Sequence, residues 1–381
     1  MNDRFVSFLL LSRWVSAIMA LMYHIRFLMF VDYGDVQGGA GLTTAFYFLT
    51  GLGHESFAVF FVLDGIVSGL ILLRHRARAA IDRAAVSQHL GSIYRILLPG
   101  LILGASFDVT GIQFFNQSGL YTAFPAFSTL TLTGSSLLGN VFMLQPFIVP
   151  TFGSNGMLYL LSYLFWSFVL LFLLVRAAEL GRTRGSIAQS VLLAAVLFIM
   201  PYQFMIWAAT WLAGVAVVVL GESRMSKPPV LIGIALFIGA LVLSRLIGSN
   251  TGLLPHPVGE WLVRCKYLFV GITFAAIAWA LYPKQAHAEP ERLVFSAIGI
   301  NNDQAGQAAS FTFYCHFPVM MLLVAMGSVL LDQPIMQQPT FMGYVAFACV
   351  LAGCVGMTVV ITRIVDIAVE AMAVRRWASW P

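Results

Sequence analysis

The sequence contains few charged residues for its length. Of 381 residues only 10% are charged, while 60% are apolar, whereas about 25% of the residues in an ordinary soluble domain are charged. The mean hydropathy is +0.88. So few charges cannot cover a soluble surface, and the composition therefore excludes a soluble enzyme, a nucleic-acid-binding protein and a disordered scaffold. We predict an all-α polytopic membrane protein.

The sequence also lacks paired cysteines. Cys265, Cys315, Cys349 and Cys354 show no CxxC spacing and lie in or beside apolar runs. A disulfide-stabilised secreted domain is not expected from this pattern, and neither is a redox or metal centre built on cysteine pairs. We interpret the four as structural thiols and predict no metal site.

Apolar runs of about 18 or more residues, long enough to cross a bilayer as helices, recur along the chain. We predict ten spans that form a single integral-membrane domain over residues 1–381. The spans lie near 5–31, 53–74, 90–110, 156–178, 187–203, 205–221, 229–248, 264–283, 308–331 and 342–372.

Lysine and arginine are absent from every second connection between these spans. The basic-free connections are 32–52, 111–155, 201–204, 249–261 and 333–340. Because membrane proteins retain basic residues on the cytoplasmic side, this alternation predicts that both termini are cytoplasmic. It also separates the fifth and sixth spans at Pro201, since merging them would invert every later loop.

The longest basic-free connection, 111–155, is itself rich in Phe, Leu, Thr and Gly. Irregular backbone cannot lie exposed to lipid. We therefore expect this segment either to re-enter the membrane or to pack over the helices on the extracytoplasmic side.

Arg13 and His24 lie on one stripe of the first span. They are eleven residues apart, and eleven steps of 100° return to within about 20° of the same helix face. The helical rise separates them by ~16 Å, with His24 nearer the extracytoplasmic end. Arginine at a helix centre costs roughly 2.5–3.5 kcal/mol on insertion scales, so Arg13 requires a partner or a watery cavity.

Two interpretations of this pair stay open. Arg13 can be a structural ion-pair residue and His24 a hydrogen-bonded interfacial histidine. Alternatively, a neutral His24 imidazole accepts a proton from an attacking hydroxyl, and the Arg13 guanidinium binds a phosphate, a carbonyl or an acidic partner.

Five sequence blocks resemble the membrane acyltransferase 3 family, in the family's order. The stretch from Arg13 to His24 resembles its R-X10-H motif. The other blocks are Gly53–Gly65, similar to "GxxxVxxFFVLSG"; Tyr94–Pro99, similar to the start of its third helix; Asn140–Gln145 with Gly153–Trp166, similar to "NxxFLQ…GSNGPLWSLSYEFW"; and Ser310–Pro318, similar to "SYSLYLxHxP".

The resemblance implies an O-acyltransferase that moves an acyl group, acetyl as first choice, from cytoplasmic acetyl-CoA to a hydroxyl of an extracytoplasmic glycan. It assigns the catalytic base to His24 and a donor-interacting role to Arg13. The implied partners are acyl-CoA, the glycan acceptor and the lipid bilayer, and a homo-oligomer is compatible with the sequence. The implied location is the bacterial cytoplasmic membrane.

The chain departs from the family pattern at several positions. Asp64 replaces a serine, Leu164 replaces a glutamate, Tyr159 replaces a tryptophan, and Arg95 stands alone where the family has two arginines. These changes fit either compensation, with Asp64 supplying the lost carboxylate, or a specialised or weakened site. Because Arg13 and Asp64 fall at nearly equal depth in a core of about 30 Å, we predict that they form a salt bridge or share a water-filled cavity.

Arginines near the cytoplasmic face are candidate ligands of the CoA donor. They are Arg74 and Arg76 after the second span and Arg95 in the third. The stretch from Arg74 to Arg83 equally fits a role in topology and in contacts with anionic headgroups.

Four further residues are candidate substrate ligands besides Asp64. His54 and Glu55 are either an interfacial polar pair or acceptor ligands, and Asn155 belongs to the fourth block. His316, beside Pro318, fits a hydrogen bond at a helix kink or a substrate role.

Three remaining polar residues have no assigned role. His89 is assigned to a loop, without a visible constellation. Arg264 and Lys266 fit an anionic-glycan role or membrane anchors whose charged ends reach the interface.

Two other function classes compete with acyl transfer. One is a carrier for a lipid-linked sugar or a small anion, and the other is a non-catalytic relative of the family. The sequence shows no internal repeat and no inverted halves, which many secondary transporters have. The acyltransferase blocks therefore make the enzyme the favoured prediction.

Overall fold

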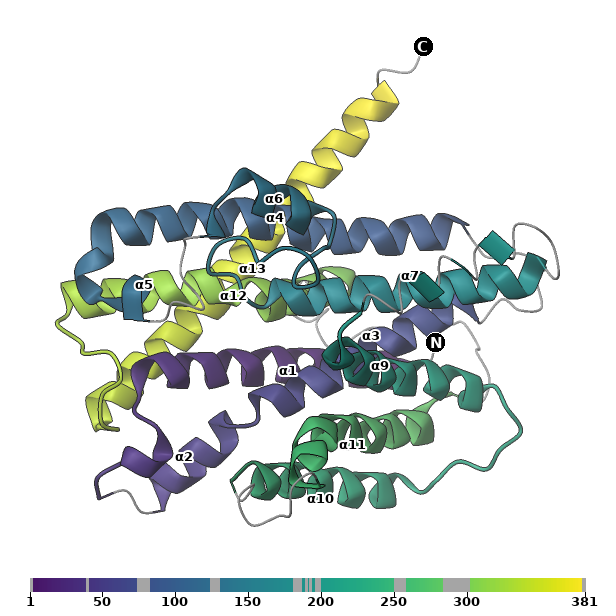
Figure 1. Ribbon diagram of the computed structural model, residues 1–381, viewed down its shortest axis with the longest axis horizontal. Coiled ribbons are helices and arrows are strands. Elements are labelled where there is room, and N and C mark those ends of the chain that lie inside the picture. The colour runs from purple at the N-terminus through teal and green to yellow at the C-terminus, as the bar shows by residue number, and fades with distance from the viewer. Residues whose placement is uncertain are drawn as a thin grey trace. The chain divides into compact units, whose positions relative to one another are not determined.

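The computed structural model describes residues 3–38, 41–73, 83–123, 131–180, 187–188, 191, 194–195, 200–249, 258–283 and 302–378. Over these residues the regular structure is helical and no strand is formed (Figure 1). Nine helices in this part of the chain are long and apolar enough to cross a membrane. The predicted all-α polytopic class is confirmed, and the chain is an integral multi-pass membrane protein.

The long helices lie close to the predicted spans, because long apolar runs determine both. They are α1 (Asp3–Met29), α3 (Gly53–Leu72), α4 (Arg83–Phe115), α7 (Leu158–Leu180), α9 (Tyr202–Gly221), α10 (Val230–Ser249), α11 (Val258–Leu281), α12 (Asn302–Leu330) and α13 (Phe341–Ala378). The predicted fifth span, 187–203, lies mostly outside the described residues. The cytoplasmic placement of the termini stays a prediction.

Shorter helices occupy two of the predicted connections. They are η1 (Tyr33–Asp35) and α2 (Leu42–Thr50) before α3, and η2 (Asn116–Ser118), α5 (Leu120–Ala123) and α6 (Gly134–Val141) after α4. Moreover, α4 begins at Arg83 rather than near 90, so the prediction that His89 lies in a loop was wrong. The apolar run marks only the part of a helix that lies inside hydrocarbon. The helix can continue beyond this run into water, so the run does not predict where the helix begins.

The chain packs as two compact units, each built from segments far apart in sequence. Unit 1 comprises Met1–Ser16, His54–Gly91 and Ser162–Arg292, and unit 2 comprises Ala17–Gly53, Ser92–Leu161 and Leu293–Pro381. Helices α1, α4 and α7 contribute residues to both units. The single domain over the whole chain stays a prediction, and each unit is described by itself below.

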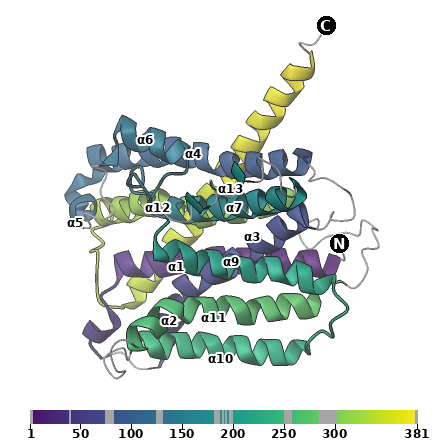
Figure 2. The same ribbon diagram turned by 45° about the vertical axis from the view of Figure 1, so that its right-hand side comes forward.

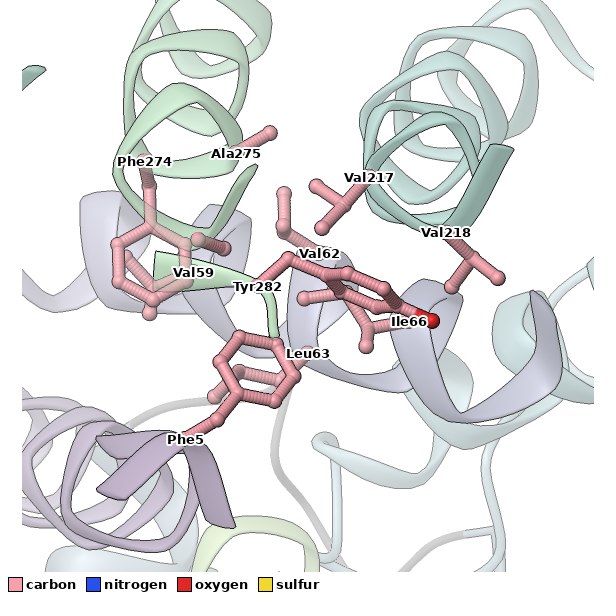
Figure 3. Close-up of a cluster of buried hydrophobic side chains, with 11 residues drawn as sticks. Phe5, Val59, Val62, Leu63, Ile66, Val217, Val218, Phe274, Ala275 and Tyr282 are labelled. Carbon is pink, nitrogen blue, oxygen red and sulfur yellow. The ribbon is translucent and has the colours of Figure 1, made fainter. Parts of the chain in front are cut away.

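The core of unit 1 forms where α1, α3, α9 and α11 meet. Figure 3 shows Phe5 and Tyr282 among the side chains of this cluster, and their rings make an edge contact with centroids 5.4 Å apart. A Cβ added at Gly65 would overlap the Trp211 carbonyl oxygen, so α3 and α9 touch through their backbones there. Because lipid is as apolar as these side chains, close packing rather than the hydrophobic effect stabilises the contact.

Two further helices of unit 1, α10 and α11, run side by side (Figures 1 and 2). They join the core through α11, which also packs against α9. The beginning of α11 therefore lies close to the end of α10.

Unit 2 is organised around α12, which packs against α13 and α4. The hydroxyls of Thr312 and Thr358 are 2.8 Å apart between α12 and α13. A Cβ at Gly100 would be 2.6 Å from the Cys315 sulfur, and one at Gly104 would be 3.3 Å from Pro318. Glycines thus allow α4 to approach α12 closely.

The segment between α4 and α7 turns back along α4. Tyr94 Oη donates a hydrogen bond of 3.1 Å to the carbonyl oxygen of Val141 at the end of α6. Tyr94 lies ~32 Å from Phe115 along the helix, so the chain returns over most of the length of α4 (Figures 1 and 2 show α6 beside α4). Re-entry into the membrane and packing over the helices both stay predictions.

Candidate functional site

Two histidines that are 292 residues apart meet inside unit 2. His24 on α1 and His316 on α12 lie 3.0 Å apart between Nδ1 and Nε2. His316 is fully buried, and its Nδ1 is 2.7 Å from the carbonyl oxygen of Thr312. The sequence placed both residues among the site candidates, and the structure brings them into contact.

The carbonyl of Thr312 determines the direction of these hydrogen bonds. A carbonyl oxygen only accepts, so His316 Nδ1 carries a proton and donates it. When the His316 ring is neutral, its Nε2 is an acceptor, and His24 Nδ1 must therefore donate. A neutral His24 then has its lone pair on Nε2, which is the nitrogen that can accept a proton from a substrate.

The surroundings of the pair restrict both rings. His24 makes an edge contact with Phe317 at 5.4 Å and with Tyr23 at 5.1 Å between ring centroids. The Thr312 hydroxyl meets Thr358, which bonds back to its own helix at the carbonyl of Cys354. His316 is thus connected to hydrogen-bonded threonines inside unit 2, whereas His24 is half-buried.

The segment between α4 and α7 is held by a buried carboxylate that was not among the predicted site residues. Asp108 on α4 is 0% exposed and accepts hydrogen bonds from the Ser154 amide at 2.7 Å and the Ser154 hydroxyl at 2.6 Å. Asn140 closes the same segment through Pro150 and Phe152. The hydrogen bonds between Ser154 and Asp108 therefore hold the fourth sequence block against α4.

Tyr121 lies just beyond α4, close to Asp108. Burial of the phenol, together with the negative charge of Asp108, raises the pKa of Tyr121 well above its ordinary value. The phenol therefore stays protonated at physiological pH and acts only as a neutral group.

Asn155 follows this anchor and is 1% exposed. Its amide contacts the Cys315 thiol and has no oxygen or nitrogen partner among the described residues. Cys315 and Pro318 face α4, whereas His316 faces α1. Asn155 and the histidine pair are thus placed against different faces of α12.

Unit 1 contains a second group of polar side chains within the apolar helices. Asp64 accepts hydrogen bonds from Trp211 Nε1 at 2.9 Å and from Ser68 at 3.4 Å. The Arg13 guanidinium lies 5.3 Å from the ring centre of Phe60, one turn before Asp64 on α3. Asp64 thus has neutral donors where the sequence predicted a guanidinium, and the salt bridge itself stays a prediction.

His89 lies within electrostatic range of both Asp64 and Arg13. It is buried, and its ring lies 4.5 Å from that of Phe168. One signal for this residue was visible, an ionisable side chain shortly before an apolar run, and the assignment of His89 to a loop concealed it.

The other predicted ligands lie apart from the histidine pair. His54 and Glu55 begin α3 in unit 1, where Glu55 accepts a hydrogen bond of 2.6 Å from Ser244. Arg95 is exposed on α4 in unit 2, within electrostatic range of Asp366 on α13. Arg74 and Arg76 lie outside the described residues. Among the residues described, no group of three or more His, Cys, Asp or Glu side chains is placed to hold a metal ion.

No family model, no curated protein and no solved structure matches the chain. The resemblance to the acyltransferase 3 family therefore depends on the sequence motifs alone.

Proposed function

We propose that the protein is a membrane O-acyltransferase that moves an acyl group, acetyl as first choice, from cytoplasmic acyl-CoA to a hydroxyl of an extracytoplasmic glycan. The supporting observation is the orientation of His24 by His316, which leaves Nε2 as the basic nitrogen of a neutral ring. An imidazole oriented by hydrogen bonds is the commonest general base in enzymes. The proposed location is the bacterial cytoplasmic membrane.

In the proposed reaction, the acceptor oxygen attacks the carbonyl carbon of the thioester while its proton moves to His24 Nε2. The carbon–sulfur bond then breaks, and the CoA thiolate leaves and takes up a proton. The products are the O-acylated glycan and free CoA thiol. Arg13 would contact the donor, a role that the resemblance implies and that suits a guanidinium near phosphate or carbonyl oxygen.

A carrier is the second candidate, and one observation favours it. Arg13, Asp64 and His89 place three ionisable side chains within the apolar helices of unit 1, and such groups often mark the pathway of an ion or a substrate. A carrier for a lipid-linked sugar or a small anion would use them directly, with no covalent chemistry at His24.

Mass spectrometry of surface glycans, from cells with and without the protein, separates these candidates. An acyl mass increment that depends on the protein supports the enzyme. Loss of the glycan from the surface without the protein, with no acylated form in its presence, supports the carrier. An unchanged glycan population contradicts both and favours a non-catalytic relative.

A further inference from the structure

Charged and aromatic side chains gather at one end of unit 1, where α3, α9 and α11 begin and α10 ends. At its centre Glu55 is 2% exposed and Ser244 is 1% exposed, and the Ser244 hydroxyl donates to the Glu55 carboxylate at 2.6 Å. Lys266 reaches the carbonyl oxygen of Ser244 at 3.5 Å. We call this group, together with Arg245, Arg264 and Glu260, the α10–α11 cluster.

The formal charges of the α10–α11 cluster do not balance. Arg245, Arg264 and Lys266 supply three cations against the two carboxylates Glu55 and Glu260. Arg264 lies 3.6 Å from Glu260 at the exposed rim. In the interior, Lys266 lies within electrostatic range of both Glu55 and Arg245. The formal charges of these five described side chains sum to +1, and the sequence of the adjoining loop, 250–257, adds no carboxylate.

Stacked rings line the same place. The rings of His54 and Tyr267 are stacked with centroids 5.5 Å apart, and Tyr267 is stacked on Trp207 at 5.8 Å. The Lys266 ammonium lies 4.9 Å from the centre of the Tyr267 ring. A stack of three rings therefore lies beside the Lys266 ammonium, as in sites that pair an apolar surface with a charged group.

We propose that the α10–α11 cluster binds one anionic group, a carboxylate or a phosphate, of the extracytoplasmic substrate. A net positive charge beside apolar helices attracts an anion, and an incoming anion would bring the sum of these charges to zero. Lys266 lies ~12 Å from the first residue of α11 and Arg245 ~6 Å from the last residue of α10, so the cluster is reached from the side that the topology assigns to the extracytoplasmic face. That this anion belongs to the acceptor rests on the proposed function; the binding of an anion does not.

The test is a binding measurement without acyl-CoA. Thermal unfolding of the purified protein, in nanodiscs of phosphatidylcholine, is followed with D-glucuronate, inorganic phosphate or the neutral D-glucose at constant ionic strength. Glucuronate and phosphate should raise the midpoint, and glucose should not. Lys266→Gln or Arg245→Gln should weaken anion binding about tenfold, because each removes a charge from a partly buried site.

Matched variants separate binding from folding. Arg224→Gln removes one exposed cation beyond the opposite end of α9 and should leave anion binding unchanged. Lys266→Arg should retain most of it. Glu55→Gln keeps an acceptor for Ser244 but removes a competing negative charge, so it should strengthen binding several-fold.

Three outcomes overturn the proposal: no response of the wild type to either anion, an equal response in Lys266→Gln, or a response shared by glucose. Stabilisation by phosphatidylglycerol in the nanodisc, lost in Lys266→Gln and without any response to glucuronate or phosphate, would make this a lipid-headgroup site and contradict the substrate assignment. Anion binding without any acyl increment on cellular glycans would overturn the proposed function and leave the site. Acyl transfer without anion binding would overturn the anion site and leave the proposed function.

Discussion

In unit 2 the polar groups around the histidine pair are neutral, whereas in unit 1 the polar groups within the apolar helices are mostly charged. The unit 2 contacts run from His24 to His316 and on to Thr312 and Thr358, and even the buried carboxylate Asp108 has two donors on one residue. In unit 1, Arg13, Asp64, Glu55 and Lys266 carry formal charge inside or beside apolar helices.

The difference suits different chemical tasks. A chain of neutral groups with defined donors and acceptors can pass a proton without exposing a net charge to a low dielectric. Fixed charges instead attract and hold ions or charged substrates. Under the proposed function, proton transfer belongs to unit 2, and we propose that unit 1 binds charged ligands.

The strongest test of this comparison is removal of His24. His24→Ala should abolish acylation, a loss of roughly 10²–10⁴-fold, because it removes the basic nitrogen. Glycan acylation is measured by mass spectrometry at equal protein levels in the membrane. Val15→Ala, at an exposed position of the same helix, is a control for insertion. Retained acylation in His24→Ala would remove this residue from the mechanism.

Removing the charge of Asp64 should have the next largest effect. Asp64→Ser restores the residue typical of the acyltransferase 3 family, yet it takes the carboxylate away from Trp211 and from the surroundings of His89, so we expect acylation to fall about tenfold or more. Adding Leu164→Glu should recover part of the loss.

Asp64→Asn separates the two contributions of this side chain, since it keeps an acceptor for Trp211 and loses the charge. A fully active Asp64→Ser single variant would rule out compensation between positions 64 and 164.

The Asp108 anchor in unit 2 should affect stability rather than chemistry. Asp108→Asn places an amide donor against the donors of Ser154, and we expect a loss of about 2–3 kcal/mol in the free energy of unfolding. Thermal unfolding in detergent measures it. Asp35→Asn, an exposed carboxylate in the same unit, should change little, and an equal effect of both variants would contradict the anchor.

Backbone contact between α3 and α9 should give the smallest effect. Gly65→Ala forces a methyl group against the Trp211 carbonyl and should cost about 1–3 kcal/mol. Gly91→Ala has open space around the new methyl group and should stay within about 0.5 kcal/mol of the wild type. Thermal unfolding compares the two, and equal midpoints would show that α3 and α9 can separate without cost.

The helices were largely predictable, because apolar length in a bilayer leaves the backbone few alternatives. Their ends were not: α4 begins at Arg83, since polar residues continue a helix in water, and this concealed His89. The course of the chain before α7 depends on Tyr94 and Asp108, which are hydrogen-bonded to residues remote in sequence. Asp108 left one visible signal, a carboxylate inside a predicted span.

The composition of the site was only partly predictable, for a similar reason. His24 and His316 were each identified as candidates from sequence blocks, but no periodicity connects residues on α1 and α12. Their contact is a tertiary property, as is the separation of Asn155 from them by the faces of α12. Charge balance in the α10–α11 cluster became visible only when Glu55 and Lys266 were placed together.

The central claim is that His316 orients His24 as the base, and the fraction of acylated glycan in His316 variants tests it most directly. The measurement is mass spectrometry of glycans from cells with equal amounts of membrane-inserted protein. His316→Leu removes the acceptor for His24 Nδ1 and should reduce acylation by about a hundredfold or more, whereas His316→Gln retains an acceptor oxygen and should keep a substantial part of it. Wild-type acylation in His316→Leu would contradict the account.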